Sequence, residues 1–273
     1  MLVYKYMPGD RFFSDFKFRL TPAEDLNDPR ELVPDIRLRD PKAYALNIIT
    51  RNVESTYWQM QIANPTRTPE QVWANILAAS RAHIQKFDEK VTAGMIYEMF
   101  MRVTNRNVGV LSLTEDPLNE LMWAHYANSH SGFAVGLDVT SDFFQPKRSD
   151  PKVCGELMNV IYTDTMPVVY VEAGTLDIPK EVFFTKATAW SYEKEWRMIK
   201  HLPTADELLI VDGKNVHLFN VPKEAIKDVL IGAKISVEAR DRVIAGVRAN
   251  APDALIRQVR FDPVNGFTTV QLK

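Results

Sequence analysis

Two acidic residues close to position 194 occupy a setting that suits catalysis. Glu193 and Glu195 lie two residues apart within the stretch KATAWSYEKEWR, which spans 186–197. Burial beside Trp raises the pKa of a carboxyl group, whereas a nearby Lys or Arg, here Lys186 and Arg197, lowers it. A carboxylate held in this way can stabilise positive charge in a transition state. The same residues could instead form a structural ion-pair cluster.

A strand that ends in hydroxyl residues is the second candidate. Ser112 and Thr114 close an apolar strand predicted over 108–113. Asp116 is the expected cap, and Pro117 the expected first residue, of a helix that runs to about Ser129. Backbone N–H groups at a helix start and a nearby hydroxyl can both bind a ligand, although a plain capped turn explains the same pattern.

The spacing of the histidines argues against metal binding. On the helix after Pro117, the residues Leu118, Leu121, Met122 and His125 form one stripe, so His125 is expected on the apolar side. There it is either a buried core histidine or a residue that orients a ribose hydroxyl. No His pair has metal-ligand spacing, and one cysteine cannot build a cysteine zinc site or an internal disulfide. We expect no metal.

Other elements must carry the remaining candidates. A helix predicted over 181–192 would place Lys186, Trp190 and Glu193 on one face, and a strand from Glu195 to His201 follows it. Lys5 lies in a predicted strand from Leu2 to Tyr6. Arg19 lies in a second one from Asp15 to Leu20, where apolar and charged residues alternate. The polar turn from Leu26 to Glu31 could close over a ligand.

A long helical block separates these N-terminal strands from the second half of the chain. The sequence predicts helices over 41–62 and 88–102. Between them, Thr68, Pro69 and Gln71 form a capping box for a third helix. That helix carries an apolar stripe at helical spacing, namely Val72, Ile76, Ala79, His83 and Phe87. We interpret 40–104 as a helical insertion or subdomain.

Strands dominate the second half, and several are joined by turns rather than by helices. We predict strands over 132–139, 153–163, 167–171, 226–231, 255–261 and 267–272, a hairpin around Asp212-Gly213 and a capped helix over 236–250. This pattern indicates an α+β fold with a mixed, mostly antiparallel sheet, and a single α+β domain over 1–273.

Composition narrows the class of protein. The 273 residues carry 33 Lys and Arg against 35 Asp and Glu, and 46% of the chain is apolar. These values exclude a disordered, collagen-like or coiled-coil chain, and they give no overall attraction to a polyanion. No signal peptide or membrane span is evident, so we expect no membrane partner. The single Cys fits the reducing cytoplasm.

Six motifs together resemble a bacterial family known as domain of unknown function 2971. They are Tyr4–Tyr6, Leu26–Glu31, Ser112–Glu115, Met122–Ala127, Gly132-Phe133 and Lys186–Arg197. The resemblance covers most of the chain except the helical block.

The order of elements is also similar to that of ADP-ribosyltransferases. Those enzymes have a basic or His residue in a first strand, then a strand that ends in Ser-x-Ser/Thr before a helix, then a Glu or Glu-x-Glu that opens a later strand. Lys5, Ser112–Thr114 and Glu193–Glu195 take these places. The first place usually holds Arg or His, and Lys cannot make the two-pronged phosphate contact of Arg. Arg19 is the alternative.

This second resemblance implies an enzyme that uses NAD as its substrate. Glu195 would hold the ribose 2′-hydroxyl and stabilise an oxocarbenium-like sugar, and Glu193 would orient or activate an acceptor. The other implied contacts are Ser112 and His125 on the nicotinamide ribose, Lys5 or Arg19 on the pyrophosphate, and Tyr126 or Trp190 on a ring. The acceptor would be a protein or a nucleic acid, and the context that of a toxin with an antitoxin or of anti-phage defence.

Two alternatives stay open. The same cleft could belong to a non-enzymatic module that senses a nucleotide or a phage component. A metal-dependent nuclease could instead use Asp28, Glu31, Glu193 and Glu195, provided that these carboxylates converge.

Overall fold

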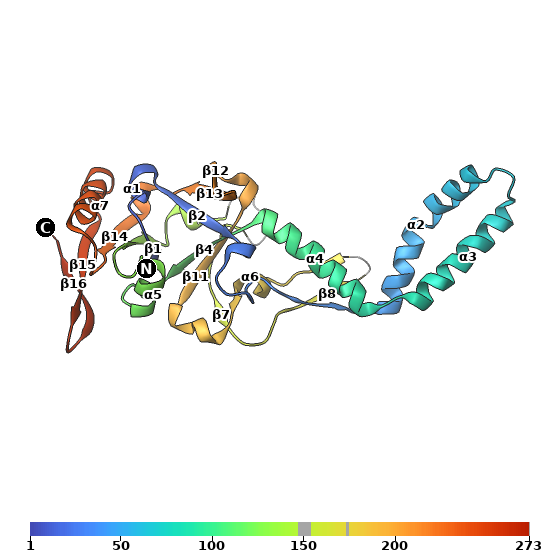
Figure 1. Ribbon diagram of the computed structural model, residues 1–273, viewed down its shortest axis with the longest axis horizontal. Helices are drawn as coiled ribbons and strands as arrows, with labels where there is room; N and C mark the ends of the chain where they lie inside the picture. Colours follow the sequence, from blue (N-terminus) through green and yellow to red (C-terminus); the bar gives the residue numbers. More distant parts are fainter. Residues whose placement is uncertain (147–153, 173–174, 273) are drawn as a thin grey trace. The chain divides into compact units, whose positions relative to one another are not determined.

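The computed structural model describes residues 1–146, 154–172 and 175–272 (Figure 1). The chain divides into two compact units. Unit 1 comprises Met1–Leu32, Val103–Thr165 and Phe183–Lys273, and unit 2 comprises Val33–Arg102 and Met166–Val182. The chain therefore leaves unit 1 twice and returns to it each time.

Unit 1 is built on a large, mostly antiparallel sheet. Its strands follow the order β12-β13-β2-β4-β1-β5-β14-β15-β16, and β11 pairs with both β4 and β6. Strands β14 and β15 pair in parallel, as a crossover through helix α7 (Val237–Asn250) requires. The strand bounds are β1 Leu2–Met7, β2 Lys17–Pro22, β4 Val108–Thr114, β5 Phe133–Asp138, β6 Leu157–Asn159, β11 Glu195–His201, β12 Glu207–Val211, β13 Lys214–Asn220, β14 Ile226–Ile231, β15 Leu255–Asp262 and β16 Gly266–Gln271.

This sheet confirms the predicted α+β class and most of the predicted strands. The hairpin β12–β13 turns at Asp212 and Gly213, which both have positive φ, as a tight hairpin turn between twisted strands requires. The predicted strand over 153–163 begins outside the described residues. Within them, it is divided into β6 and a short β7 (Ile161–Tyr162), which pairs in parallel with β10 (Thr185–Lys186).

Side-chain alternation gives β4 and β11 one apolar face and one polar face. Leu113 lies opposite Trp196, and Leu111 opposite Met198; these four pack in the main core. The residues between them must point to the other face of the sheet. That face therefore receives Ser112 and Thr114 from β4, and Arg197 and Glu195 from β11, directly opposite them.

The predicted helix over 181–192 is wrong. The chain instead forms α6 (Glu181–Phe184), then β10, then a 3-10 turn, η3 (Thr188–Glu193), which ends at Lys194 with φ 43°. Residues 186–193 thus bend back on themselves instead of advancing along a helix axis. Lys186 still meets Glu193, but through this bend rather than through helical spacing.

The helix after Ser112 is shorter than predicted. Helix α5 covers Glu120–Tyr126 and is capped by Asn119, whose side chain accepts from the N–H groups of residues 121 and 122. Asp116 instead accepts from the N–H of Leu118 and so shapes the preceding turn. Residues 128–130 all have positive φ, which ends the helix before Ser129.

Unit 2 contains the predicted helices. Helix α2 (Pro41–Ala63) and helix α3 (Pro69–Lys86) form a hairpin, and α4 (Glu89–Asn107) ends in unit 1. The capping box of Thr68 and Gln71 is confirmed, with both reciprocal hydrogen bonds present. A small sheet, β3-β8-β9, completes the unit, with bounds Asp35–Leu38, Val168–Glu172 and Thr175–Asp177.

The predicted apolar stripe of α3 is only partly buried. Val72 and Ile76 are buried, whereas Ala79 and His83 are exposed. Since α2 buries only Ala45, the hairpin keeps little apolar surface from water. Among the described residues, no helix combines the length and the apolar composition that a membrane crossing needs.

The other short elements of unit 1 are turns at strand ends. They are α1 (Phe12–Asp15), η1 (Ala23–Asp25), η2 (Asp142–Phe144), η4 (Leu202–Thr204) and η5 (Lys223–Ala225).

Candidate active site

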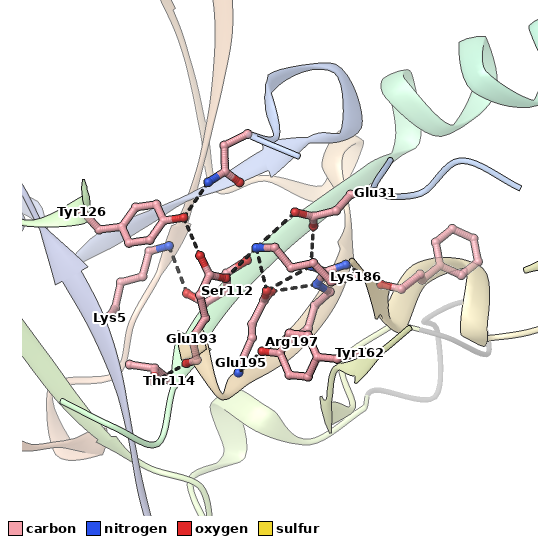
Figure 2. Close-up of polar contacts among 12 residues, drawn as sticks. Lys5, Glu31, Ser112, Thr114, Tyr126, Tyr162, Lys186, Glu193, Glu195 and Arg197 are labelled. Carbon is pink, nitrogen blue, oxygen red and sulfur yellow. Dashed lines mark hydrogen bonds and ion pairs between the residues drawn. The ribbon is translucent and has the colours of Figure 1, made fainter. Parts of the chain in front are cut away.

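A cavity of about 560 Å³ opens within unit 1 beside the polar face of β4 and β11. It collects seven of the eight predicted site residues, from β1, β2, β4, α5, η3 and β11. The seven are Lys5, Arg19, Ser112, His125, Tyr126, Glu193 and Glu195. Trp190 does not line it. Residues that lie up to 190 positions apart in the sequence therefore meet at one cavity, and Figure 2 shows the polar contacts at its floor.

Glu195 is buried and held by two cations. Its Oε1 accepts from Arg197 Nε at 2.9 Å, and its Oε2 accepts from Arg197 Nη2 and from Lys186 Nζ, each at 3.2 Å. The Ser112 hydroxyl also bonds to this carboxylate. Burial opposes its charge, but Arg197 and then Lys186 outweigh burial and lower the pKa of Glu195 to about 2. Glu195 is therefore ionised at neutral pH.

Lys186 connects three buried glutamates. Its Nζ lies 2.6 Å from Glu193 Oε2 and 3.2 Å from Glu195 Oε2. It also lies 3.2 Å from Glu31 Oε1, an ion pair without the alignment of a hydrogen bond. Burial works against the charge of Lys186, yet the three carboxylates raise its pKa above the ordinary value.

Arg197 belongs to the same buried cluster. Its side chain is fully buried, pairs with both Glu195 and Glu31, and donates through Nη1 to the carbonyl of Phe183 at 2.9 Å. Burial raises the pKa of Glu31, and the two cations only partly offset this. The cluster thus sets three carboxylates against two buried cations.

Glu193 keeps more acceptor capacity than Glu195. Its Oε1 accepts from the Tyr126 hydroxyl and its Oε2 from Lys186, both at 2.6 Å. A carboxylate has about four lone-pair sites, so two remain on Glu193, whereas the bonds described above fill those of Glu195. Asn27 donates to the Tyr126 oxygen at 2.5 Å and fixes the phenol.

The backbone around the two glutamates is held as well. The Thr114 hydroxyl donates to the carbonyl of Glu193 at 2.6 Å, and the N–H of Glu195 donates to the Tyr162 hydroxyl at 2.7 Å. These bonds fix the main chain on both sides of Lys194, the residue with positive φ.

Lys5 differs from the other cations around the cavity. In the described structure, Arg11, Lys17, Arg19 and Lys186 each pair with a carboxylate, whereas Lys5 donates from Nζ to the carbonyl of Ser112 at 3.1 Å. Burial lowers the pKa of Lys5 to about 8, and the attraction of Glu195 and Glu193 only partly offsets it. Lys5 is therefore the cation best placed to accept an anionic ligand group.

Three of the predicted site residues lie in settings that the sequence did not predict, and His125 is not on the apolar side of its helix. His125 is exposed and lies at the cavity rim, because α5 buries Met122 and Trp123 instead. Arg19 is exposed and paired with Asp25 at 2.5 Å. Trp190 lies outside the cavity with its ring 4.9 Å from Lys186 Nζ, a cation–π contact.

Two features of the site did not follow from the sequence. The sequence places Glu31 in a polar turn or among metal ligands, whereas its pairing with Arg197 spans 166 residues, which no local pattern encodes. Lys17 also lines the cavity. A signal for it was present, since Lys17, Arg19 and Thr21 alternate with buried residues along β2.

Comparison with known proteins supports the family resemblance. Residues 122–198 match a family model described as a protein of unknown function (DUF2971). This region contains most of α5, and Glu193, Glu195 and Arg197. Neither the curated proteins nor the solved structures gave a match to the chain.

Proposed function

We propose that this protein is an ADP-ribosyltransferase-like enzyme that binds NAD in the unit 1 cavity and cleaves its nicotinamide–ribose bond. One observation carries the proposal: Glu193, Glu195, Ser112 and Lys5 line a single cavity of about 560 Å³. That volume lies within the range of small-molecule and cofactor sites. Acids, hydroxyls and a cation that pairs with no carboxylate among the described residues suit a ligand that carries both ribose and phosphate.

The proposed chemistry needs an anion near the sugar. The C1′–N bond breaks and its electron pair passes to the nicotinamide nitrogen, so nicotinamide leaves neutral and no general acid is required. The ribose becomes oxocarbenium-like, as in glycoside hydrolysis. An acceptor oxygen then bonds to C1′ and releases its proton. A preorganised carboxylate contributes several kcal/mol to the first step, about a hundred- to a thousandfold in rate.

We assign the substrate-facing role to Glu193. Its two open lone-pair sites can accept a ribose hydroxyl, and the bonds from Tyr126 and Lys186 orient it. Glu195 then serves chiefly to hold Ser112, Lys186 and Arg197 in place. This reverses the expectation from the sequence, in which Glu195 held the ribose and Glu193 served the acceptor. Lys5 is the proposed contact for the phosphates.

The experiment measures free nicotinamide after NAD is added, with and without protein and nucleic-acid acceptors. We expect release by the wild type and a fall of about a hundredfold or more in Glu193→Gln. Glu115→Gln is the matched control: it removes one acidic charge from an exposed residue that does not line the cavity. Absence of nicotinamide release from wild-type protein under every acceptor condition would refute the proposal.

A non-enzymatic nucleotide-binding module is the second candidate. It is favoured by the ion pairs of Lys186 with both Glu193 and Glu195, because a carboxylate paired with a cation stabilises a new positive charge less well. It predicts calorimetric binding of NAD or another nucleotide without any product.

The metal-dependent nuclease has less support. The oxygens of Glu31, Glu193 and Glu195 already face Lys186 and Arg197, so a Mg²⁺ ion would meet two cations there. Among residues 1–146, 154–172 and 175–272, no group of three or more His, Cys, Asp or Glu residues could hold a metal ion.

The biological setting extends the same proposal. An enzyme that consumes NAD or modifies a macromolecule suits a toxin controlled by an antitoxin, or an effector of anti-phage defence, acting in the cytoplasm. A protein or nucleic-acid acceptor would have to reach the cavity past His125 at its rim.

A further inference from the structure

The helical hairpin of unit 2 exposes an unusual amount of apolar surface. Six of its large apolar side chains are between 43% and 76% exposed, three on each helix: Leu46, Trp58 and Ile62 on α2, and Trp73, Leu77 and Ile84 on α3. Isolated exposed apolar residues are ordinary on a protein surface. Two tryptophans and four aliphatic residues on one hairpin are a feature that needs a physical reason.

Helix α3 has two distinct apolar faces. Val72 and Ile76 are buried. Trp73, Leu77 and Ile84, at spacings of four and seven residues, form a second stripe that remains exposed. The ring of Tyr57 on α2 lies 5.3 Å from the ring of Trp73 and 5.4 Å from that of Trp58, so aromatic groups of both helices adjoin one another. A helix that is apolar on two sides is typical of one packed on two sides.

The hairpin is also poor in charge. Residues 41–86 hold seven Lys, Arg, Asp and Glu among 46 residues, whereas 25% of the whole chain is charged. Five of the seven are basic, too few and too scattered to select a nucleic acid or an anionic membrane. The partner that fits such a surface is another apolar, weakly charged protein face.

We infer that the hairpin is a dimerisation element that pairs with the same hairpin of a second copy of this chain. Two antiparallel helical hairpins of equal length can close into a four-helix bundle. In a two-fold symmetric dimer, the low-charge surface of one copy contacts the same surface of the other. The six side chains expose on the order of 600 Å² per copy, if aromatic side chains present 150–250 Å² each when fully exposed. A standard interface takes about 800 Å² from each partner, which flanking hairpin atoms would complete.

The test measures the mass of the full chain by light scattering across a range of concentrations. The expected mass is twice 31.2 kDa for the wild type. The double substitution Trp73→Glu with Leu77→Glu should return it to a single chain. The matched control places Glu at Leu208 and Ile210 of β12, which are 55% and 76% exposed in unit 1, and should stay dimeric.

Circular dichroism checks that the hairpin stays helical. If the double variant loses helix, Ile62→Glu alone replaces it, because Ile62 is 76% exposed and supports little packing within its own hairpin. A wild-type protein that remains a single chain at about 100 µM overturns the inference, whatever else then covers the hairpin. So does a control variant that dissociates as readily as the hairpin variants.

Discussion

At the scale of single residues, the buried ion cluster is the main feature that positions the candidate site. Removing charges from water costs several kcal/mol per ion, so a cluster of three glutamates, a lysine and an arginine is a weak source of stability. Its value lies in position, because Arg197 and Lys186 aim Glu195 and Glu193 at the cavity. A buried cluster of charges that costs free energy and borders a cavity is typical of functional sites.

Arg197→Met should destabilise the protein strongly. The change leaves Glu195 and Glu31 buried with only Lys186 to balance them, which we expect to cost about 3–5 kcal/mol in free energy of unfolding. Urea denaturation measures the loss. Arg37→Met, which breaks an exposed ion pair with Asp35, should cost at most about 1 kcal/mol. Equal losses in the two variants would contradict this account.

Binding of an anionic ligand should depend on the charge of Lys5. Its pKa is lowered to about 8 by burial, so the side chain loses its charge around pH 8 instead of near the 10.5 of an ordinary lysine. NAD affinity, measured by calorimetry, should therefore fall as the pH rises through about 8. Lys5→Met should bind weakly at every pH, without that step. A step that persists in Lys5→Met would assign it to another group.

The same shift affects folding with a defined sign. Between pH 8 and 10.5 unfolded Lys5 binds more protons than folded Lys5, so its contribution to stability rises with pH. Glu195 affects the free energy of unfolding at acidic pH. Its pKa falls from 4.5 to about 2 on folding, so its contribution is present above 4.5 and is lost as the pH drops towards 2.

At the scale of elements, the sequence correctly predicted the helices and strands whose formation depends on interactions between residues near one another in the chain. Strand β2 follows from the alternation of apolar and charged residues, and the start of α3 from the capping residues Thr68 and Gln71. The failure lies at 181–193, where helical spacing of Lys186, Trp190 and Glu193 suggested a continuous helix. There the buried partners of Lys186, one of them Glu31, compete with helical hydrogen bonds and decide the path.

The sequence predicted which residues lie at the candidate site, but it did not predict which of their charges pair with one another. Motif residues such as Ser112 and Glu195 were recognisable because they end or begin strands. The pairing of Glu31 with Arg197, and the freedom of Lys5 from any carboxylate partner in the described structure, depend on contacts over more than a hundred residues. Such contacts exist only once the sheet has formed.

The junction between α5 and β5 offers a test at this scale. A Cβ at Gly132 would lie 2.1 Å from the carbonyl oxygen of Met7, a main-chain atom of β1 that pairing with β5 holds in place. We expect Gly132→Ala to lower the free energy of unfolding by about 3 kcal/mol. A Cβ at Gly9 meets nothing within 4 Å, so Gly9→Ala is the control and should be nearly neutral.

At the scale of the whole molecule, the two units divide the work. Every residue that lines the cavity belongs to unit 1, while the α2–α3 hairpin belongs to unit 2. The cavity walls carry five cations and five carboxylates, so selectivity must come from their arrangement rather than from an overall field. The near-zero charge of the chain agrees with this.

This division predicts that loosening the hairpin leaves the cavity intact. Thr68→Ala removes the hydroxyl that accepts from the Gln71 N–H and should cost the hairpin about 1 kcal/mol. Hydrogen exchange should speed up over 69–86, because those amides open with the helix. NAD affinity and the exchange of β4 and β11 should stay within error, since none of their residues lies in unit 2. Ser236→Ala, which uncaps α7 in unit 1, is the matched control and should loosen 237–250 instead. A change in NAD affinity with Thr68→Ala alone would show that the two units act together in binding.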